Sequence, residues 1–268
     1  MQNRLFEPYY EAMLRKEYWD FRAKDYNEIT SNKLEPEQEK HNLISFFLKK
    51  GIINANSRVL DLGCGPGKFT QVFAPHVKEI IGVDISENMI QYAKKNNAAY
   101  KNAYFVIMNW DKDSISTLGT FDLVFANMCP AIYDIHTLNK MNSVSHGYCY
   151  YSHFAARSNN IGDDLDMLFE IKHTFKRIPL MFSYLWEQGY RPTVHYEEKR
   201  SESKLSLQEA FIYYQKEYGC PSKKKEQMKS ILQKYMTDDG MIYRKSWFQK
   251  GILFWNVNSS ISFGRKIV

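Results

Sequence analysis

The chain has 268 residues, of which 44% are hydrophobic and 25% are charged, the balance of an ordinary soluble globular protein. Its 19 Tyr, 17 Phe and 5 Trp exclude a disordered chain, and no apolar run is long enough to suggest a membrane span. Four cysteines are too few for a disulfide scaffold, and residues 1–8 lack the apolar core of a signal peptide, so we expect a cytoplasmic protein.

The net charge of +6 is unevenly distributed along the chain. Residues 1–198 carry 22 basic and 24 acidic side chains, whereas residues 199–250 carry 12 and 6 and residues 251–268 add two basic ones. The basic excess therefore belongs to the C-terminal part, where it raises the question of an anionic partner.

The predicted elements alternate between helices and short apolar strands. Helices are expected over 5–30, 34–50, 68–73, 86–99, 132–142, 163–176 and 180–188, and strands over 58–62, 79–84, 103–108, 121–126 and 147–154. This alternation predicts a parallel sheet with helices on both faces. After Gly189, two more strands are expected over 193–199 and 251–257, with helices over 206–218 and 223–236 inserted between them.

These elements predict one α/β domain with a seven-stranded sheet. We expect an N-terminal helical cover over 1–50, a core over 51–198, a helical insertion or lid over 199–250, and a final strand and tail over 251–268.

A glycine-rich segment follows the first predicted strand. Gly63, Gly65 and Gly67 stand at alternate positions between that strand and the next helix. Glycines at such a place allow a tight turn and let a ligand approach main-chain atoms. A βα turn without any ligand is the plainer interpretation of the glycines alone.

Two carboxylates make a ligand the better interpretation. Asp61 ends the first strand, where it can meet an ammonium group, and Asp84 ends the second strand 23 residues later, a position suited to ribose hydroxyls. The Gly-x-Gly-x-Gly spacing differs from the dinucleotide fingerprint, and an acid beside the loop disfavours a pyrophosphate. The pattern predicts an adenosine-type ligand that carries an amino-acid tail.

These motifs resemble those of the class I S-adenosylmethionine-dependent methyltransferases, in particular the small-molecule members of type 11 and type 25. Residues 61–67 are similar to the first motif of the family, and residues 83–86 with Met89 to the second. Residues 121–127 resemble its fourth-strand motif, and residues 18–20 resemble a helix that covers the cofactor. The resemblance implies a Rossmann-like fold with a mostly parallel sheet, and S-adenosyl-L-methionine as cofactor.

The resemblance also implies roles for individual residues. Asp61, Gly63, Gly65 and Gly67 are expected on the methionine side, Asp84 at the ribose, Ile85, Met89, Asn109 and Trp110 around the adenine, and Asn127 beside the methionine moiety and the methyl group. Ser86, in the second motif, is also expected to bind the cofactor. The family usually places an acid after the third strand. Here Asn109 stands at that position with Asp111 two residues on, and which of them fills the role stays open.

Catalytic candidates are the polar residues at or near the ends of later strands, because open α/β sheets bind ligands at the carboxyl ends of their strands. They are Asn127, Tyr133, His136, His153 and Arg157. A base is needed only if the nucleophile arrives protonated. The cysteine spacing predicts no metal site.

We therefore predict methyl transfer to a small soluble acceptor by in-line displacement, without a membrane or nucleic-acid partner. One alternative is a methyltransferase that docks RNA or protein on the basic insertion, where Lys223–Lys225 are otherwise a solvated face. Another is a catalytically silent cofactor-binding protein. A nicotinamide oxidoreductase is less favoured because of the glycine spacing. The acceptor atom, the use of a base and the oligomeric state stay open.

Overall fold

The computed structural model describes residues 13–32, 37–171, 175–218 and 222–259. Parts of four predicted segments lie outside the described residues: the starts of the helices over 5–30 and 34–50, residues 172–174 of the helix over 163–176, and the tail after residue 259.

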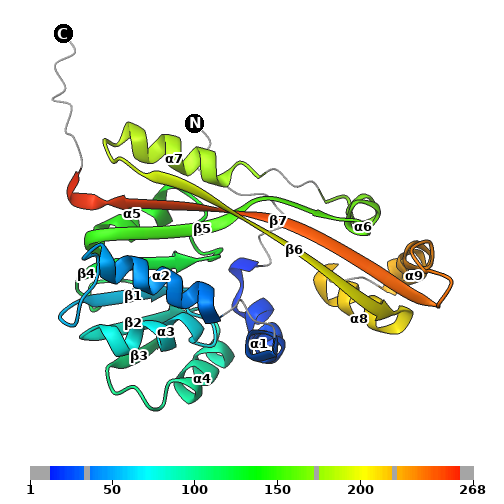
Figure 1. Cartoon of the computed structure of the whole chain (residues 1–268), viewed down its shortest axis with the longest axis horizontal. Helices are drawn as coiled ribbons and strands as arrows, with labels where there is room; N and C mark the ends of the chain where they lie inside the picture. Colours follow the sequence, from blue (N-terminus) through cyan, green and yellow to red (C-terminus); the bar gives the residue numbers. More distant parts are fainter. Residues whose placement is uncertain (1–12, 33–36, 172–174, 219–221, 260–268) are drawn as a thin grey trace, which may run out of the picture. The chain divides into compact units, whose positions relative to one another are not determined.

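The strands form one seven-stranded sheet in the order β3-β2-β1-β4-β5-β7-β6 (Figure 1). They are β1 (Arg58–Leu62), β2 (Glu79–Asp84), β3 (Ala103–Ile107), β4 (Phe121–Asn127), β5 (Ser145–Asn159), β6 (Thr193–Ser206) and β7 (Met241–Asn256). The first five strands pair in parallel, β1 with β2 and β4, β2 with β3, and β4 with β5. The predicted α/β fold with a mostly parallel seven-stranded sheet is confirmed.

The helices are α1 (Lys16–Asn32), α2 (Glu37–Lys49), α3 (Lys68–Phe73), α4 (Glu87–Asn96), α5 (Ile135–Ser143), α6 (Gly162–Phe169), α7 (Arg177–Glu187), α8 (Leu207–Tyr218) and α9 (Lys225–Gln233). Ser86 caps α4, because its side chain accepts a hydrogen bond from the backbone N–H of Met89. Helix α6 ends seven residues earlier than predicted, since Glu170 takes a left-handed conformation with φ 58°.

Strands β5, β6 and β7 are much longer than predicted. The strand expected over 193–199 continues to Ser206. Its charged and polar side chains pair across to β7: Glu197 with Lys250 Nζ at 2.6 Å and Ser201 Oγ with Ser246 Oγ at 2.7 Å. Such cross-strand pairs stabilise a solvent-facing ladder. The insertion between the last two strands is therefore shorter than predicted and spans 207–240.

The contacts within the chain define two compact units. The first comprises residues 1–153, 176–195 and 252–268, and the second comprises residues 154–175 and 196–251. No described helix is both long enough and apolar enough to cross a membrane.

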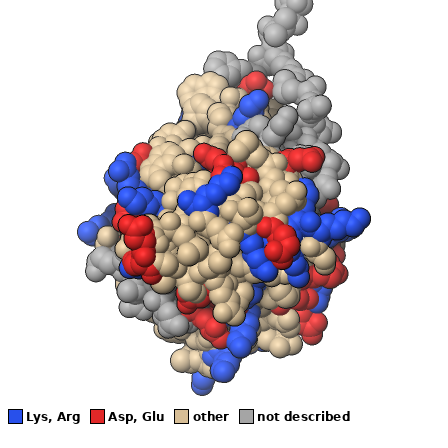
Figure 2. Space-filling model, turned by 90° about the vertical axis from the view of Figure 1, so that its right-hand side faces the viewer, with Lys and Arg blue, Asp and Glu red and all other residues tan. Residues whose placement is uncertain are grey.

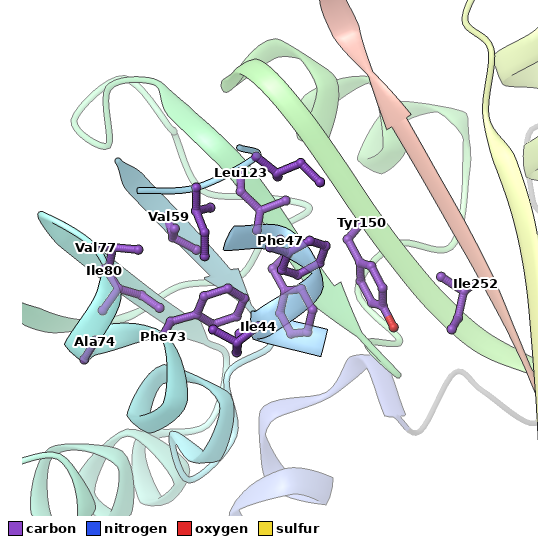
Figure 3. Close-up of a cluster of buried hydrophobic side chains, with 13 residues drawn as sticks. Ile44, Phe47, Val59, Phe73, Ala74, Val77, Ile80, Leu123, Tyr150 and Ile252 are labelled. Atoms are coloured by element: carbon purple, nitrogen blue, oxygen red, sulfur yellow. The ribbon is translucent and has the colours of Figure 1, made fainter. Parts of the chain in front are cut away.

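The core of the first unit packs aromatic rings of α2 and α3 against the sheet (Figure 3). Phe47 of α2 stacks on Phe73 of α3 with ring centroids 6.1 Å apart, and Phe125 of β4 stacks on Tyr150 of β5 at 4.7 Å. All four side chains are almost completely buried. This packing fixes β1 and β4 beneath the two helices, and so fixes the loops that leave their carboxyl ends.

The second unit has a core of its own. Its buried side chains come from α6, α8, α9, β7 and the turn before α6; they are Ile161, Leu165, Ala210, Tyr214, Met228, Leu232 and Ile242. The hydroxyl of Tyr214 donates to Asn159 Oδ1 at 3.2 Å, which satisfies the polar end of a buried ring.

Candidate functional site

A cavity of about 690 Å³ lies in the first unit at the carboxyl ends of β1, β2, β3 and β4. Of the residues predicted from the sequence, its walls include Gly63, Gly65, Asp84, Ile85, Met89, Asn109, Trp110, Asn127 and Tyr133. Asp61, Gly67, Ser86, His136, His153 and Arg157 are not among the lining residues. Nine of the predicted residues therefore lie together at the carboxyl ends of these strands.

The three glycines of the loop have different structural reasons to be glycine. All have positive φ: 71° at Gly63, 52° at Gly65 and 78° at Gly67. A Cβ on Gly63 would lie 2.5 Å from Cys129 Sγ, and one on Gly67 would lie 2.4 Å from the side-chain nitrogen of Asn97. A Cβ on Gly65 would meet nothing closer than 4.0 Å. Gly63 and Gly67 are required by packing, whereas Gly65 leaves open space next to the main chain, as a ligand needs.

Asp84 joins the glycine loop to the start of α4. Its carboxylate accepts hydrogen bonds from the backbone N–H of Gly65 and of Ser86, both at 2.9 Å. Burial raises the pKa of this carboxyl group to about 6. The two backbone bonds fix the carboxylate at the cavity wall, where its remaining acceptor capacity suits ribose hydroxyls.

Asp61 is buried beside the cavity instead of lining it. Its side chain is 3% exposed and accepts a hydrogen bond from Thr70 Oγ1 at 2.6 Å. Burial raises the pKa of Asp61 to about 7. A cationic group placed nearby would favour the ionised carboxylate and lower that pKa again.

In the loop after β3, the side chain of Asn109 forms hydrogen bonds within its own loop. Its Oδ1 accepts hydrogen bonds from the backbone N–H of Asp111 at 3.1 Å and of Lys112 at 3.3 Å, so the amide oxygen closes the turn of its own loop. Trp110 is buried and donates from Nε1 to the carbonyl of Thr137 at 3.1 Å, which fixes its ring at the wall. Asp111 supplies a carboxylate on the same wall.

At the end of β4, the side chain of Asn127 is held by Ser152, which the sequence analysis did not predict as a site residue. Ser152, which faces Asn127 in the β4–β5 register, donates its hydroxyl hydrogen to Asn127 Oδ1 at 2.8 Å. The same hydroxyl accepts from the N–H of Met128 at 3.0 Å, and Met128 has φ 50°. Only the parallel pairing of the strands brings Ser152 to this place, so no motif in the sequence marks it.

Three catalytic candidates lie elsewhere. His136 is mostly exposed, with Nε2 4.0 Å from Asp111 Oδ1. His153 is buried, and its ring stacks on that of Tyr151 with centroids 6.3 Å apart. Arg157 belongs to the second unit, where it pairs with Glu217 at 3.8 Å. The structure therefore brings only Asn127 and Tyr133 of the five candidates to the cavity wall.

Helix α1 and the turn before it form a further wall. The side chains concerned are Met13, Leu14, Arg15, Trp19 and Tyr26. Asp20 fixes this wall on the start of α4, since it accepts from Ser86 Oγ at 2.6 Å and from Asn88 N–H at 3.2 Å. Asn96, near the end of α4, donates to Asn27 Oδ1 at 2.9 Å and to the carbonyl of Pro66 in the glycine loop at 2.8 Å. The helix resembling a cofactor cover thus forms part of this cavity wall.

The cavity suits an adenosine bearing an amino-acid tail. It offers the carboxylate of Asp84, open main chain at Gly65, and buried apolar side chains at Met89 and Trp110. Within the described ranges, no three His, Cys, Asp or Glu side chains are placed to hold a metal ion.

Known proteins with similar sequences are methyltransferases. The chain is 33% identical over 103 residues to the ribosomal protein L11 methyltransferase of Thermotoga petrophila, a match that covers 38% of this chain and 37% of that protein. It is 41% identical over 76 residues to the malonyl-[acyl-carrier protein] O-methyltransferase of Legionella pneumophila subsp. pneumophila, covering 27% and 26%. The chain therefore spans only about a third of the length of the curated relatives it matches.

A solved structure shares the fold. The magnesium protoporphyrin IX methyltransferase of Synechocystis PCC 6803, with S-adenosylhomocysteine bound, superposes with a TM-score of 0.51 at 12% identity, over 91% of this chain and 98% of that one. The family model described as a methyltransferase domain matches residues 53–234, more than half of the chain. The chain therefore belongs to the methyltransferase-domain family.

Proposed function

We propose that the protein transfers a methyl group from S-adenosylmethionine to a small soluble acceptor. The observation that carries this proposal is that side chains of α1 and the preceding turn wall the same cavity that the glycine loop and Asp84 line. A cavity of about 690 Å³ enclosed on that side suits a cofactor and a small molecule better than a macromolecular surface.

In this proposal, each residue binds the part of S-adenosylmethionine that suits its chemistry. Asp84 accepts hydrogen bonds from the ribose, the main chain at Gly65 admits the methionine moiety, and Met89 and Trp110 offer apolar faces to the adenine. Asp61 favours a positive charge nearby. S-adenosylmethionine supplies an electrophilic methyl group on a sulfonium, so the protein contributes mainly positioning and exclusion of water. Asn127 lies at the end of β4, where it can orient the acceptor.

A macromolecular acceptor docked on the basic C-terminal segment is the competing proposal. The second unit, which contains most of this segment, carries 14 Lys and Arg residues against 12 Asp and Glu. Several of its basic groups are paired with acids, as Lys250 is with Glu197 and Lys204 with Asp239. On the face drawn in Figure 2, basic and acidic side chains intermingle instead of forming a basic patch. This distribution favours the small acceptor.

The test separates acceptors by size. The protein is incubated with S-adenosylmethionine labelled with tritium in the methyl group and with a cell extract divided into small molecules, RNA and protein. We expect label to enter the small-molecule fraction, and Asp84→Asn to reduce this incorporation. Label confined to RNA or protein would overturn the small acceptor. Binding of S-adenosylhomocysteine without transfer to any fraction would instead identify a silent cofactor-binding protein.

A further inference from the structure

A hollow of about 390 Å³ lies in the second unit, on residues of β5, β6 and β7. Its lining includes Ser158 near the end of β5, Arg200 of β6, and Lys245 and Trp247 of β7. No described residue lines both this hollow and the cavity of the first unit. The hollow is therefore a separate candidate binding site.

Arg200 and Trp247 stand opposite each other on neighbouring strands. The cross-strand pairs of β6 and β7 described above show that the two strands are antiparallel, and Ser201 faces Ser246 in this pairing. The next position along each strand therefore brings Arg200 opposite Trp247. Side chains that oppose each other in this way share one face of a sheet, so a single small molecule can contact both the guanidinium and the indole.

Three hydrogen-bond donors in the hollow are not used by the described parts of the chain. The guanidinium of Arg200, the indole N–H of Trp247 and the hydroxyl of Ser158 make no hydrogen bond or ion pair with any described residue. Arg200 is exposed and Trp247 is half-buried. These donors can therefore bind a ligand without first breaking contacts within the described chain.

The charges around the hollow favour an anion. Arg200 and Lys245 supply two positive charges, and Glu202 is the one carboxylate among the described residues that line the hollow. Lys245 Nζ lies 3.8 Å from Glu202 Oε1, and the two side chains are 65% and 70% exposed. An exposed ion pair of this kind contributes little to stability, so the ammonium group can turn to a stronger acceptor.

We propose that this hollow binds a small molecule that joins a flat aromatic ring to a phosphate group. The ring lies against the indole of Trp247. The phosphate accepts hydrogen bonds from Arg200, Lys245 and Ser158, because donors from three strands match its three terminal oxygens better than the two of a carboxylate.

The size of the hollow agrees with a small ligand. Its volume of about 390 Å³ falls within the range of small-molecule sites, roughly 300–1,000 Å³, which favours such a ligand over a polymer. The inference does not depend on the proposed function, because the hollow and the cavity of the first unit share no described residue.

The experiment uses uridine 5′-monophosphate as a probe that joins a flat ring to a phosphate. Uridine supplies the ring alone, and inorganic phosphate supplies the anion alone. Each probe is titrated by calorimetry into the full chain with excess S-adenosylhomocysteine, which keeps nucleosides out of the cavity of the first unit. In NMR spectra, the indole N–H signal that is missing in Trp247→Leu identifies Trp247, and its shift in the wild-type protein reports where the probe binds.

Two variants each remove one part of the site. Arg200→Met removes the guanidinium, and Trp247→Leu removes the aromatic face. Lys204→Met and Tyr243→Leu are the matched controls, since Lys204 lies on β6 and Tyr243 on β7, both are exposed, and neither lines the hollow. Thermal melting checks that each variant is folded.

The variants should separate the two halves of the probe. We expect Arg200→Met to weaken uridine 5′-monophosphate and phosphate about tenfold, the contribution of one charged hydrogen bond, and to leave uridine unchanged. Trp247→Leu should weaken uridine 5′-monophosphate and uridine about fivefold or more, the loss of one stacking contact, and leave phosphate unchanged. Both controls should bind all three probes like the wild type.

Other results overturn the site. It is wrong if uridine 5′-monophosphate does not bind the wild type, if the indole signal of Trp247 does not shift, or if the two variants bind like their controls. A single-stranded oligouridylate that shifts the same signal and binds much more tightly than the mononucleotide would also contradict a small ligand, since the hollow would then belong to a longer nucleic-acid surface.

Discussion

The two compact units use the same residue types for different ends, and Asp84 and Asp239 show the difference most clearly. Both carboxylates accept hydrogen bonds from backbone N–H groups near the start of the next element. Burial raises the pKa of Asp84 to about 6, whereas an exposed pair with Lys204 lowers that of Asp239 to about 2. A carboxylate held at a cavity wall against its own desolvation cost marks a binding site, and a carboxylate paired at the surface marks local structure.

The largest difference is expected between two glycines of similar conformation. Gly63→Ala places a methyl group 2.5 Å from Cys129 Sγ at φ 71°, and Gly240→Ala places one in open space at φ 74°. The left-handed conformation costs each variant about 1–2 kcal/mol, and overpacking adds about 1–3 kcal/mol at Gly63. We expect Gly63→Ala to abolish S-adenosylhomocysteine binding and Gly240→Ala to keep it, measured by calorimetry and thermal melting. Equal effects of the two substitutions on binding would contradict a specific role of Gly63 in the binding site.

The second prediction concerns the charges of Asp84 and Asp239, each of which is removed in turn. Asp84→Asn removes the charge that accepts the ribose hydroxyls, and should weaken S-adenosylhomocysteine by about 1–3 kcal/mol, or roughly 5- to 150-fold. Asp239→Asn removes an exposed ion pair and should leave the dissociation constant unchanged. Unchanged affinity in Asp84→Asn would contradict the assignment of this residue to the cofactor.

The third prediction concerns pH. The folded-state pKa values of Asp61 and Asp84, about 7 and about 6, lie above their usual values, so the free protein loses stability from these groups as pH rises from about 4 to 7. Asp239 has the opposite sign, and its contribution is lost as pH falls towards about 2. Because an ammonium group near Asp61 favours the ionised carboxylate, and S-adenosylhomocysteine carries such a group, its affinity should rise about tenfold from pH 5.5 to 8.

Calorimetry in buffers with different ionisation enthalpies checks this prediction by counting protons. Binding near pH 6.5 should release protons. Proton uptake, or affinity that falls as pH rises, would show that ligand binding does not ionise these carboxyl groups.

The smallest effect is expected for Ser152. Its hydroxyl donates to Asn127 and accepts from the N–H of Met128, and Ser145 on the same strand likewise donates to Tyr148 and accepts from the N–H of Gly147. Each alanine variant loses hydrogen bonds worth about 0.5–1.5 kcal/mol. Melting temperatures should fall in both, but only Ser152→Ala should weaken S-adenosylhomocysteine, by a few-fold, with recovery in Ser152→Thr. Equal binding in the two alanine variants would reduce Ser152 to a structural role.

Local chemistry explains what the sequence could predict. The glycine turn, the Ser86 cap and the position of Asp84 depend on neighbours along the chain, and a motif records them. The lengths of β5, β6 and β7 depend on cross-strand pairing, as between Glu197 and Lys250, which a charged sequence conceals. The role of Asn109 could not be predicted from the sequence either, because the hydrogen bond of its amide oxygen within its own turn is visible only in the structure.

The site residues that no motif marks reach the cavity through contacts between distant parts of the chain. Ser152 reaches Asn127 through strand pairing, and Leu14 reaches the cavity from the turn before α1. Such tertiary contacts leave no spacing rule in the sequence. Arg157 and His153 fit the expected strand end, but β5 runs on to Asn159, so neither residue stands at its end.

We infer that the cavity of the first unit binds the cofactor through Asp84 and the glycine loop. Calorimetric titration of S-adenosylhomocysteine into the wild-type protein and into Asp84→Asn tests it most directly. We expect saturable binding at one site in the wild type and clearly weaker binding in the variant. No binding by the wild type, or equal affinity in both proteins, would contradict it.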